Sequence, residues 1–280
     1  MQIKRYNTKT LGYKLALLTD LHLEKDFNYN ILDDIVEKMK NEKPDYICLS
    51  GDIIDSYEVI FDVDLTNRLF NFIKSLSNIS QTIVTLGNHE LQTKLKSKGN
   101  IEEVNKFFLK LNTIENVYYL YNKSLVRDNL CFTSIDLPYE YYKLKPGRKS
   151  TNFFIKEIDK NIHMNKRYYN ILLCHSPIDV LKKDVLNNSK EIRKTNLILS
   201  GHMHNGMVPK FLDHKGNIGF IGPNKIFLPK TARGIVTKYI DYHEINLIIS
   251  GGITKISSEN SKFLHKFNNC LNSEIVIINI

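Results

Sequence analysis

Short apolar runs rich in β-branched residues recur along the chain, and each has the length of a strand buried on both faces. We expect strands at Lys14 to Thr19, Tyr46 to Ser50, Thr82 to Leu86, Leu130 to Ile135, Asn170 to Cys174 and Asn196 to Ser200. Between several of them the apolar positions change to a helical period, which predicts helices at Ile31 to Lys40 and Leu65 to Leu76. Alternating strands and helices predict an α/β fold with parallel strands.

The C-terminal third has a different pattern, because glycines and prolines divide it into shorter apolar runs. Brief strand candidates between residues 216 and 234 precede two longer ones, Ile245 to Ser250 and Glu274 to Ile280. We interpret this third as a second sheet. Since no linker rich in Gly and Ser or in Pro divides the sequence, one domain over residues 1–280 is predicted.

Composition narrows the class of protein. The 280 residues are 42% hydrophobic and 25% charged, as in a folded globular chain. The cysteines Cys48, Cys131, Cys174 and Cys270 lack CxxC spacing, so buried thiols are expected rather than disulfides. No run approaches the roughly 18 apolar residues of a spanning helix, and the N-terminus lacks the apolar core of a signal peptide. We therefore predict a soluble, cytoplasmic protein, with peripheral membrane contact as the alternative.

The chain is basic, with a formal net charge of +9 and a pI near 9.1. This charge favours anionic partners, which include phosphorylated substrates, nucleic acid and an acidic membrane face. Composition does not choose among these three classes.

Residue types that bind metals stand directly after most of the predicted strands. The loops read TDLH after the first strand, SGDIID after the second and LGNHE after the third, and CHSP and SGHMHNG follow later. The candidate ligands are Asp20, His22, Asp52, Asn88, His175, His202 and His204. Because the carboxyl ends of parallel strands share one edge of a sheet, we expect these side chains to converge there.

The ligand types indicate which ions could bind. Carboxylate and imidazole together suit divalent Mn, Fe, Zn or Co, and the lack of neighbouring cysteine argues against a structural zinc site. Seven candidates exceed the needs of one ion, and two ions need a ligand that reaches both. A carboxylate such as Asp52 does this better than an imidazole. Gly51, Gly87 and Gly201 are expected to allow sharp turns and close approach of the backbone.

The order DxH, GD, GNH(D/E), an isolated His and GHxH resembles the calcineurin-like metallophosphoesterase superfamily, and the resemblance runs from Asp20 to His204. It implies a four-layer fold, in which a two-sheet β-sandwich is flanked by helices and carries a dinuclear metal site at the sheet edge. It also implies that His89 lies over the substrate phosphate without binding metal. The implied ligands are Asp20, His22 and His204 for one ion, Asn88, His175 and His202 for the other, and Asp52 between them.

Later segments, NKIFLPKTARG, LIISGGI and SEIVIINI, more faintly resemble a bacterial branch of small membrane-associated phosphoesterases. Members of that branch often carry an N-terminal signal or anchor segment, which this sequence lacks. A soluble member and a chain trimmed at its N-terminus both remain open. Glu90 stands where Asp is commoner in the superfamily, which bears on the hydrogen bonding of His89.

The reaction predicted from this site is hydrolysis of a phosphate ester, with a phosphodiester or a pyrophosphate favoured as substrate. A hydroxide bridging two divalent ions, Mn favoured, would attack phosphorus. Asp52 and His89 are the candidate catalytic residues, and Asn88, Tyr139 and Arg148 are candidates for contact with a small phosphorylated or lipid-headgroup substrate. The alternatives are a nuclease, which the basic charge suggests but does not favour, and a non-catalytic metal-binding scaffold of the same fold.

Three further sets of residues have weaker predicted roles. The segment Leu137 to Ser150 interleaves Tyr139, Tyr141 and Tyr142 with four basic residues, so we expect a lip over the metals that grips a bulky anionic diester; an ordinary solvated loop is the alternative. Asp55 and Asp136 are candidates to support the ligands. No ligand role is expected for His163, His214, His243 and His265.

Overall fold

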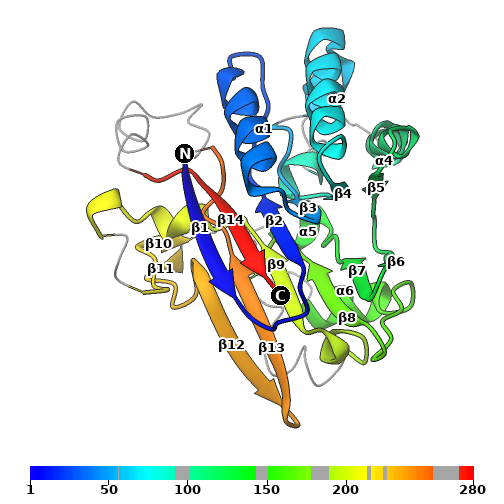
Figure 1. The fold of residues 1–280 in the computed structure, drawn as a ribbon, viewed down its shortest axis with the longest axis vertical. Helices are drawn as coiled ribbons and strands as arrows, with labels where there is room; N and C mark the ends of the chain where they lie inside the picture. The colour runs from blue at the N-terminus through cyan, green and yellow to red at the C-terminus, as the bar shows by residue number, and fades with distance from the viewer. Residues whose placement is uncertain are drawn as a thin grey trace.

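Two six-stranded β-sheets lie face to face in the computed structural model (Figure 1). The structure describes residues 1–55, 57–91, 101–142, 151–177, 189–212, 216–222, 226–254 and 271–280. The first sheet has the order β1 (Gln2–Asn7), β14 (Glu274–Asn279), β2 (Lys14–Leu18), β3 (Tyr46–Ser50), β4 (Gln81–Thr85) and β5 (Val117–Tyr119). Its neighbours pair in parallel, except that β14 runs antiparallel to β2.

The second sheet is also mixed. Its order is β12 (Gly234–Ile240), β13 (His243–Ile249), β9 (Leu197–Ser200), β8 (Tyr169–Leu173), β7 (Leu130–Ser134) and β6 (Ser124–Arg127). The pairs β12–β13 and β6–β7 are antiparallel, and the inner pairs are parallel. A small separate hairpin pairs β10 (Ile221–Gly222) with β11 (Ile226–Phe227).

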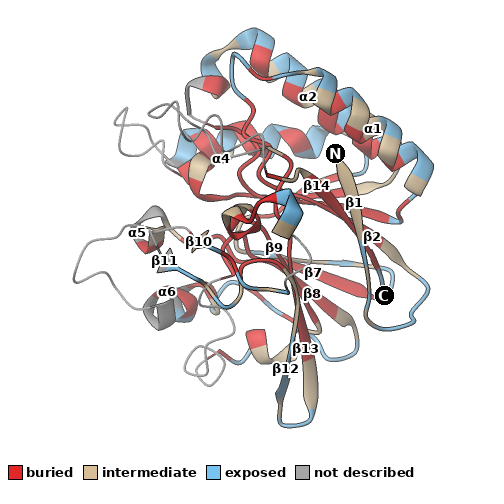
Figure 2. Cartoon of the chain, turned by 90° about the vertical axis from the view of Figure 1, so that its left-hand side faces the viewer, coloured by how far each residue is buried: buried red, intermediate tan, exposed pale blue. Residues whose placement is uncertain are grey.

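Helices cover the outer face of each sheet. The helices α1 (Asn30–Glu42), α2 (Val63–Ser77) and α4 (Ile101–Leu109) cover the first sheet, and α5 (Tyr139–Tyr142) and α6 (Thr151–Ile158) cover the second. Short 3₁₀ helices lie at η1 (Tyr57–Phe61), η2 (Lys110–Thr113), η3 (Ile192–Lys194), η4 (His204–Met207) and η5 (Lys210–Leu212). Figure 2 shows buried residues along the strands and exposed ones on the outer faces of α1 and α2. The predicted four-layer fold is confirmed.

The packing of β2 explains why this strand is hydrophobic at every position. Leu15 and Leu17 pack into the core between the two sheets, whereas Ala16 and Leu18 pack into the core beneath the helices of the first sheet. A strand covered on both faces has no solvent side, so the alternation of apolar and polar residues disappears. The six strands and two helices predicted from such runs are confirmed, with ends that shift by one or two residues.

The assignment of the C-terminal third to a second sheet is wrong for its last strand. β13 joins the second sheet as expected, but β14 inserts between β1 and β2 of the first sheet. The apolar residues of β14 alternate between the two cores, with Val276 facing the inter-sheet core and Ile275 facing the helices. Such a strand needs cover on both faces, which a central place in either sheet provides. The expectation of parallel strands also fails here.

Three other expectations concern the chain as a whole. Cys48, Cys131 and Cys174 are buried free thiols as predicted, and Cys270 lies outside the described residues. Across the described ranges, no helix combines the length and the apolar character that crossing a membrane requires. The single domain over residues 1–280 stays a prediction.

Candidate metal centre

The predicted ligands converge at the carboxyl ends of five strands, β2, β3 and β4 of the first sheet and β8 and β9 of the second. Backbone bonds join neighbouring loops within each sheet: Asp20 N donates to Gly51 O at 3.2 Å in the first, and Gly201 N donates to His175 O at 3.0 Å in the second. Between the sheets, the amide of His202 donates to Asp20 Oδ1 at 3.1 Å. The strand order and the parallel pairing therefore bring together residues that are up to 184 positions apart, from Asp20 to His204.

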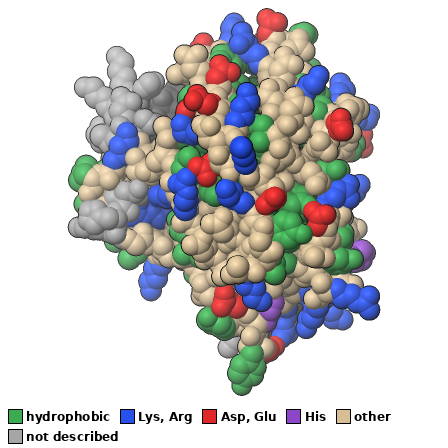
Figure 3. Space-filling view, viewed as in Figure 1, with side chains coloured by type: hydrophobic (Ala, Val, Ile, Leu, Met, Phe, Trp, Pro, Cys, Tyr) green, Lys and Arg blue, Asp and Glu red, His purple; other side chains and the backbone are tan. Residues whose placement is uncertain are grey.

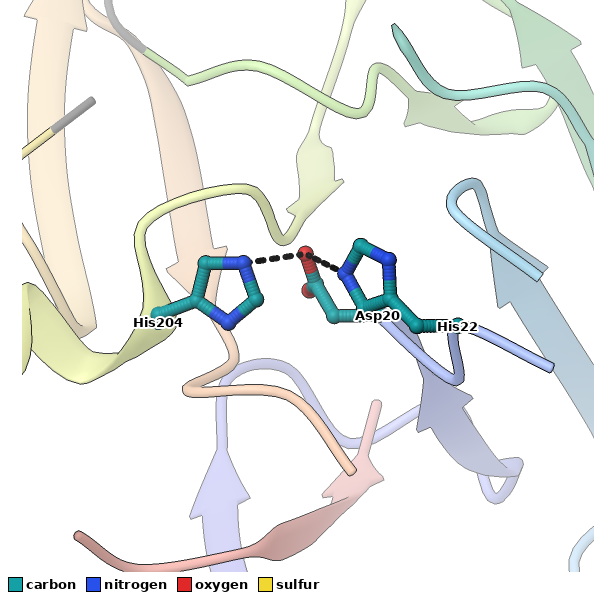
Figure 4. Close-up of side chains that lie close together, drawn as sticks. All are labelled: Asp20, His22 and His204. Carbon is teal, nitrogen blue, oxygen red and sulfur yellow. Dashed lines mark ion pairs between the residues drawn. The ribbon is translucent and has the colours of Figure 1, made fainter. Parts of the chain in front are cut away.

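Asp20, His22 and His204 form one group that could hold an ion (Figure 4). Asp20 Oδ1 lies 3.7 Å from His204 Nε2 and 4.0 Å from His22 Nε2. The Asp20 carboxylate is fixed by Thr19 Oγ1, which donates to Oδ2 at 2.8 Å, and by the amide of His202 at 3.1 Å from Oδ1. These bonds leave Oδ1 directed between the two imidazoles.

Asp52, His175 and His202 form a second group. Asp52 Oδ2 is 2.9 Å from His175 Nε2 and 3.9 Å from His22 Nε2, so one carboxylate oxygen faces a member of each group. The other oxygen, Oδ1, accepts the amide proton of His89 at 2.8 Å. Asp52 therefore has the position that a ligand shared by two ions needs.

The tautomer of His175 follows from its partner. Nδ1 of this ring lies 2.8 Å from Ser50 O, and a carbonyl only accepts, so Nδ1 carries the proton. Nε2 then offers its lone pair, the form in which a neutral imidazole binds a metal. Burial lowers the pKa of His175, but the Asp52 carboxylate outweighs it and raises the pKa to about 9. At neutral pH this raised pKa puts a second proton on Nε2, next to Asp52. A cation between Nε2 and the Asp52 carboxylate would replace that second proton.

Several buried polar atoms in the described part of this site have no hydrogen-bond partner, among them His22 Nε2 and Asn88 Oδ1. Leaving such an atom unpaired costs about 1–3 kcal/mol, and native proteins avoid it. Both atoms are lone-pair donors of the kind that divalent cations bind. The residues therefore fit a pair of divalent ions.

The backbone at the ligands is strained. Five of the seven candidate ligands occupy the left-handed region, with φ of 54° at Asp20, 49° at His22, 51° at Asp52, 67° at His202 and 43° at His204. For residues with a Cβ this conformation costs about 1–3 kcal/mol each, and it persists at functional sites because the surrounding structure imposes it. In this arrangement the ligand atoms at the strand ends lie close to one another.

Gly87 and Gly201 allow the ligand loops to approach each other. A Cβ on Gly87 would lie 2.2 Å from Asp52 Oδ1, and a Cβ on Gly201 would lie 2.4 Å from Asp20 Oδ2. Both distances are shorter than any real contact of a methyl group, so any larger residue would displace a ligand carboxylate. The close approach predicted for these glycines is thus an approach of one ligand loop to another.

His89 is held by Asp55. Its Nδ1 donates to Asp55 O at 2.7 Å, and Asp55 Oδ1 also lies 3.2 Å from Nδ1 of His22. The rings of His22 and His89 meet edge to face at 4.4 Å between centroids. Burial lowers the pKa of His89, but the Asp52 and Asp55 carboxylates outweigh it and raise the pKa to about 10. Asp55 thus orients two imidazoles, one of a candidate ligand and one of the candidate acid.

Glu90 has a role that the sequence did not indicate. Its buried carboxylate accepts four backbone amides, from Gly87 at 2.6 Å, Asp52 at 3.0 Å, Ile53 at 2.6 Å and Ile54 at 3.0 Å. It joins the loop after β3 to the loop after β4 and makes no hydrogen bond to the His89 ring, which Asp55 holds instead. Its place directly after GNH was its only signal in the sequence.

Asp136 supports the site from the second sheet. Its Oδ1 accepts the amide of Leu86 at 2.9 Å, and its Oδ2 accepts the amide of Asn122 at 2.9 Å and the hydroxyl of Ser134 at 2.8 Å. Burial raises the pKa of Asp136 to about 6. This carboxyl therefore ties the end of β4, just before the GNHE loop, to the end of β7.

The predicted lip is described only in part. Arg148 lies outside the described residues, and for Tyr139 only the backbone, in α5, is described. Tyr142 packs edge to face on His202 at 5.1 Å between centroids, so this tyrosine does lie at the site. The expectation is wrong for Tyr141, which is 2% exposed and packs into the core of the second sheet.

Of the histidines expected to have no ligand role, His163 and His243 are described, and neither belongs to a metal-binding group found among the described residues. His163 is exposed, and His243 donates from Nε2 to Thr195 O at 2.7 Å. His214 and His265 lie outside the described residues.

Comparison with known proteins places the chain in a family. The model of the family described as calcineurin-like phosphoesterase matches residues 13–206. An uncharacterized metallophosphoesterase of Campylobacter jejuni is 28% identical, with 85% of this chain and 53% of that protein covered. An uncharacterized metallophosphoesterase of Helicobacter pylori is 29% identical over 71% of this chain and 46% of that protein. A putative metallophosphoesterase of Caenorhabditis elegans is 28% identical, with 75% of this chain and 40% of that protein covered.

The chain spans about half the length of the curated relatives it matches. A crystal structure of a dimetal phosphatase from Danio rerio overlays with a TM-score of 0.41 and 13% identity, covering 86% of this chain and 87% of that chain. That overlay is too loose to support an argument about this protein. The family model spans more than two thirds of the 280 residues, including all seven candidate ligands. With two groups of metal-ligand side chains at the edge of a two-sheet sandwich, the chain belongs to the calcineurin-like phosphoesterase family, the metallophosphoesterases, and family and site together imply two divalent ions.

Proposed function

We propose that this protein hydrolyses a phosphodiester or a pyrophosphate, with two divalent ions and Mn favoured as the metal. The observation that carries the proposal is the pair of ligand groups, in which Asp52 of the second group also faces His22 of the first, together with buried ligand atoms, His22 Nε2 and Asn88 Oδ1, that have no hydrogen-bond partner. Carboxylate, amide and imidazole ligands together suit Mn as well as Fe, Zn or Co.

The two groups of side chains suggest which ligands would hold each ion. Asp20, His22 and His204 would hold one ion, and Asp52 would be shared. Asn88 would join His175 and His202 around the other ion. When bound, the two ions would activate water for attack on phosphorus near neutral pH and would offset negative charge on the phosphoryl oxygens.

His89 would supply the proton of the reaction. Because Nδ1 donates to the carbonyl of Asp55, a protonated ring carries its second proton on Nε2. The His89 side chain is 21% exposed, against 1% for His175, so a substrate can reach this ring from solvent. A positioned imidazolium can stabilise a phosphoryl oxygen or protonate the leaving oxygen, effects worth about 10²- to 10⁴-fold in rate.

Metal removal and reloading test the proposal. The purified protein is stripped with a chelator, checked by elemental analysis and assayed on bis-p-nitrophenyl phosphate, p-nitrophenyl phosphate and a nucleoside diphosphate sugar. Activity should disappear on stripping and return with about two equivalents of Mn. Turnover of the diester or the pyrophosphate should exceed that of the monoester. Full activity of the stripped protein would rule out the metal mechanism, and a preference for the monoester would rule out the substrate class.

A lipid headgroup is the substrate that one further observation favours. Large apolar side chains stand exposed by 42–76% beside the site, on η5 and around the β10–β11 hairpin: Phe211, Ile218, Phe220, Phe227 and Leu228. Phe220 N donates to Gly206 O at 2.7 Å, and Leu228 N donates to Phe220 O at 3.0 Å, so two of these residues are linked to the turn that carries His204. Exposed apolar groups flanked by the exposed Lys210 and Lys230 are typical of contact with an anionic membrane.

Vesicle sedimentation tests this preference. With phosphatidylglycerol vesicles, a variant carrying Phe211→Ser, Phe227→Ser and Leu228→Ser should sediment several-fold less than the original protein. The matched control removes exposed apolar side chains elsewhere, Val63→Ser, Leu109→Ser and Val126→Ser, and should sediment normally. Equal sedimentation of both variants, or binding of an oligonucleotide in place of vesicles, would count against a membrane substrate.

A further inference from the structure

A basic cleft of about 860 Å³ lies away from the metal site. It is lined by the β1–β2 connection, the segments before β7 and β8, η3 and the β12–β13 turn. Six of its lining residues are basic and one, Asp241, is acidic; the basic ones are Lys9, Lys166, Arg167, Lys190, Arg193 and Lys194. Figure 3 shows Lys and Arg side chains gathered on the lower part of this face, toward the end where β12 and β13 meet in Figure 1.

The cleft lies at the opposite end of the strands from the metals. Tyr169 begins β8 and lines the cleft, whereas His175 follows the end of the same strand and belongs to the metal site. Six residues of extended chain span about 20 Å. Asn196, just before β9, likewise lines the cleft, whereas His202, just after β9, belongs to the metal site. A molecule in the cleft therefore does not lie on the metal ions, and the cleft is a second site.

The positive charge of the cleft is only partly neutralised. Arg193 pairs with Asp241, and Lys194 Nζ lies 2.6 Å from Glu191 Oε1. Within the described ranges, Lys166, Arg167 and Lys190 form no ion pair and are exposed. Three neighbouring cations without an internal partner favour an anion from outside the chain.

The floor of the cleft is built from rigid parts. The buried amide of Asn170, 1% exposed, donates to the carbonyls of Tyr168 at 3.2 Å and Lys194 at 3.0 Å, and so fixes two walls against each other. Tyr13, Tyr168 and Tyr169 are partly exposed in the lining. A cleft that needs no rearrangement loses less free energy on binding, and its concave shape and volume suit a compact ligand better than a flat surface.

We propose that this cleft binds a nucleotide, with the base against the tyrosines and the phosphates on Lys166, Arg167 and Lys190. Aromatic faces next to cations accept a base and a phosphate together, whereas inorganic phosphate would use the cations alone. The inference rests on the cleft and does not depend on the proposed hydrolysis at the metal site.

ATP binding to the chain of residues 1–280 in the presence of EDTA tests the proposal. Calorimetry should give one saturable site, and a variant with Lys166→Glu, Arg167→Glu and Lys190→Glu should bind ATP at least tenfold more weakly. A second variant, Lys40→Glu, Lys74→Glu and Lys106→Glu, changes net charge equally on the helical face and should bind as the original does. Hydrolysis of an aryl phosphate by metal-loaded protein, measured separately, should be the same in all three.

Four outcomes would overturn the proposal. They are the absence of saturable ATP binding, equal weakening in both charge variants, unchanged binding in the cleft variant, and binding of pyrophosphate as tightly as ATP. Binding of oligothymidylate without binding of ATP would overturn it in favour of nucleic acid. Failure of the aryl phosphate assay would count against the proposed hydrolysis and not against the cleft.

Discussion

The two ends of the β-sandwich differ in how their polar groups are held. At the carboxyl ends of β2, β3 and β9, ligand residues with positive φ, such as Asp20, Asp52 and His202, carry side chains that are almost fully buried. At the amino ends of β8 and β9, cations stand in solvent around an open cleft. Left-handed residues occur there too, but Asp241 and Tyr242 are the two central residues of the β12–β13 turn, whose type favours this conformation.

The difference shows how far the stability of each end depends on a bound ligand. The metal end holds strained backbone and unpaired lone pairs, and a bound cation would offset both costs, so binding should stabilise the fold. The cleft end is complete without a ligand, because exposed lysines are hydrated and cost little. Metal binding should therefore raise the free energy of unfolding strongly, and a ligand in the cleft should raise it only weakly.

The largest effect is expected from Asp52→Ala, which removes the carboxylate placed between the two groups. The variant should lose both ions and more than about 10³-fold of kcat/KM on an aryl phosphodiester. Elemental analysis and kinetics measure the two losses. Asp45→Ala at the opposite end, where Asp45 Oδ2 accepts the amide of Lys14 at 2.7 Å, is the control and should retain both ions. An Asp52 variant that keeps two ions would contradict the shared position.

A smaller effect is expected from His89→Asn, because the role proposed for His89 is that of a proton donor and not of a ligand. The metal content should stay at two ions, and kcat should fall by about 10²- to 10⁴-fold with little change in KM. Loss of metal in this variant, as in the Asp52 variant, would mean that His89 itself binds an ion. Its ring nitrogen lies close enough to ligand atoms of His22 and Asp55 for the three residues to hold one together.

Substituting one glycine at each end compares the two regions directly. Gly87→Ala places a methyl group 2.2 Å from Asp52 Oδ1, so kcat/KM should fall by about 10- to 100-fold, as when supporting groups around a metal are lost. Gly12→Ala lies near the cleft with φ of 87° and no atom within 4 Å of the added Cβ. It should cost about 1 kcal/mol of stability and leave activity unchanged. Equal activity of the two variants would show that the close approach at Gly87 is not needed.

Much of the metal centre could be predicted from the sequence, because each ligand follows an apolar run directly and parallel strands bring such positions to one edge. The supporting carboxylates could not be assigned in the same way. Glu90 acts on amides of another loop, and Asp136 acts across the two sheets, so their roles depend on distances between segments that no local pattern encodes.

The same reason limits the rest of the fold. The run that forms β14 is apolar at successive positions and fits the centre of either sheet, so its place depends on which neighbours remain unpaired. The cleft combines residues from separate segments, such as Lys9, Arg167 and Lys190, without a shared motif. Tyr141 and Tyr142 are adjacent in sequence, yet one faces the core and the other faces His202, because a helical turn directs successive side chains differently.

The smallest effect concerns pH and the support of the metal end by Asp136. Its pKa is raised by burial to about 6 in the folded protein, against an ordinary value near 3.9 in the unfolded chain. A group with a raised folded pKa stabilises the fold when protonated; the contribution is full below about pH 4 and is lost as the pH rises through 6. Between pH 5 and pH 8 the loss amounts to about 1 kcal/mol.

Replacing this carboxyl should remove that part of the pH dependence. Asp136→Ala loses three hydrogen bonds and should be less stable at every pH, but its free energy of unfolding should fall by about 1 kcal/mol less than that of the original between pH 5 and pH 8. Urea unfolding in the presence of a chelator measures the difference, since metal binding has its own pH dependence. If the two proteins lose equal stability over this range, the carboxyl is already ionised at pH 5, and its contacts to Leu86 and Asn122 outweigh its burial.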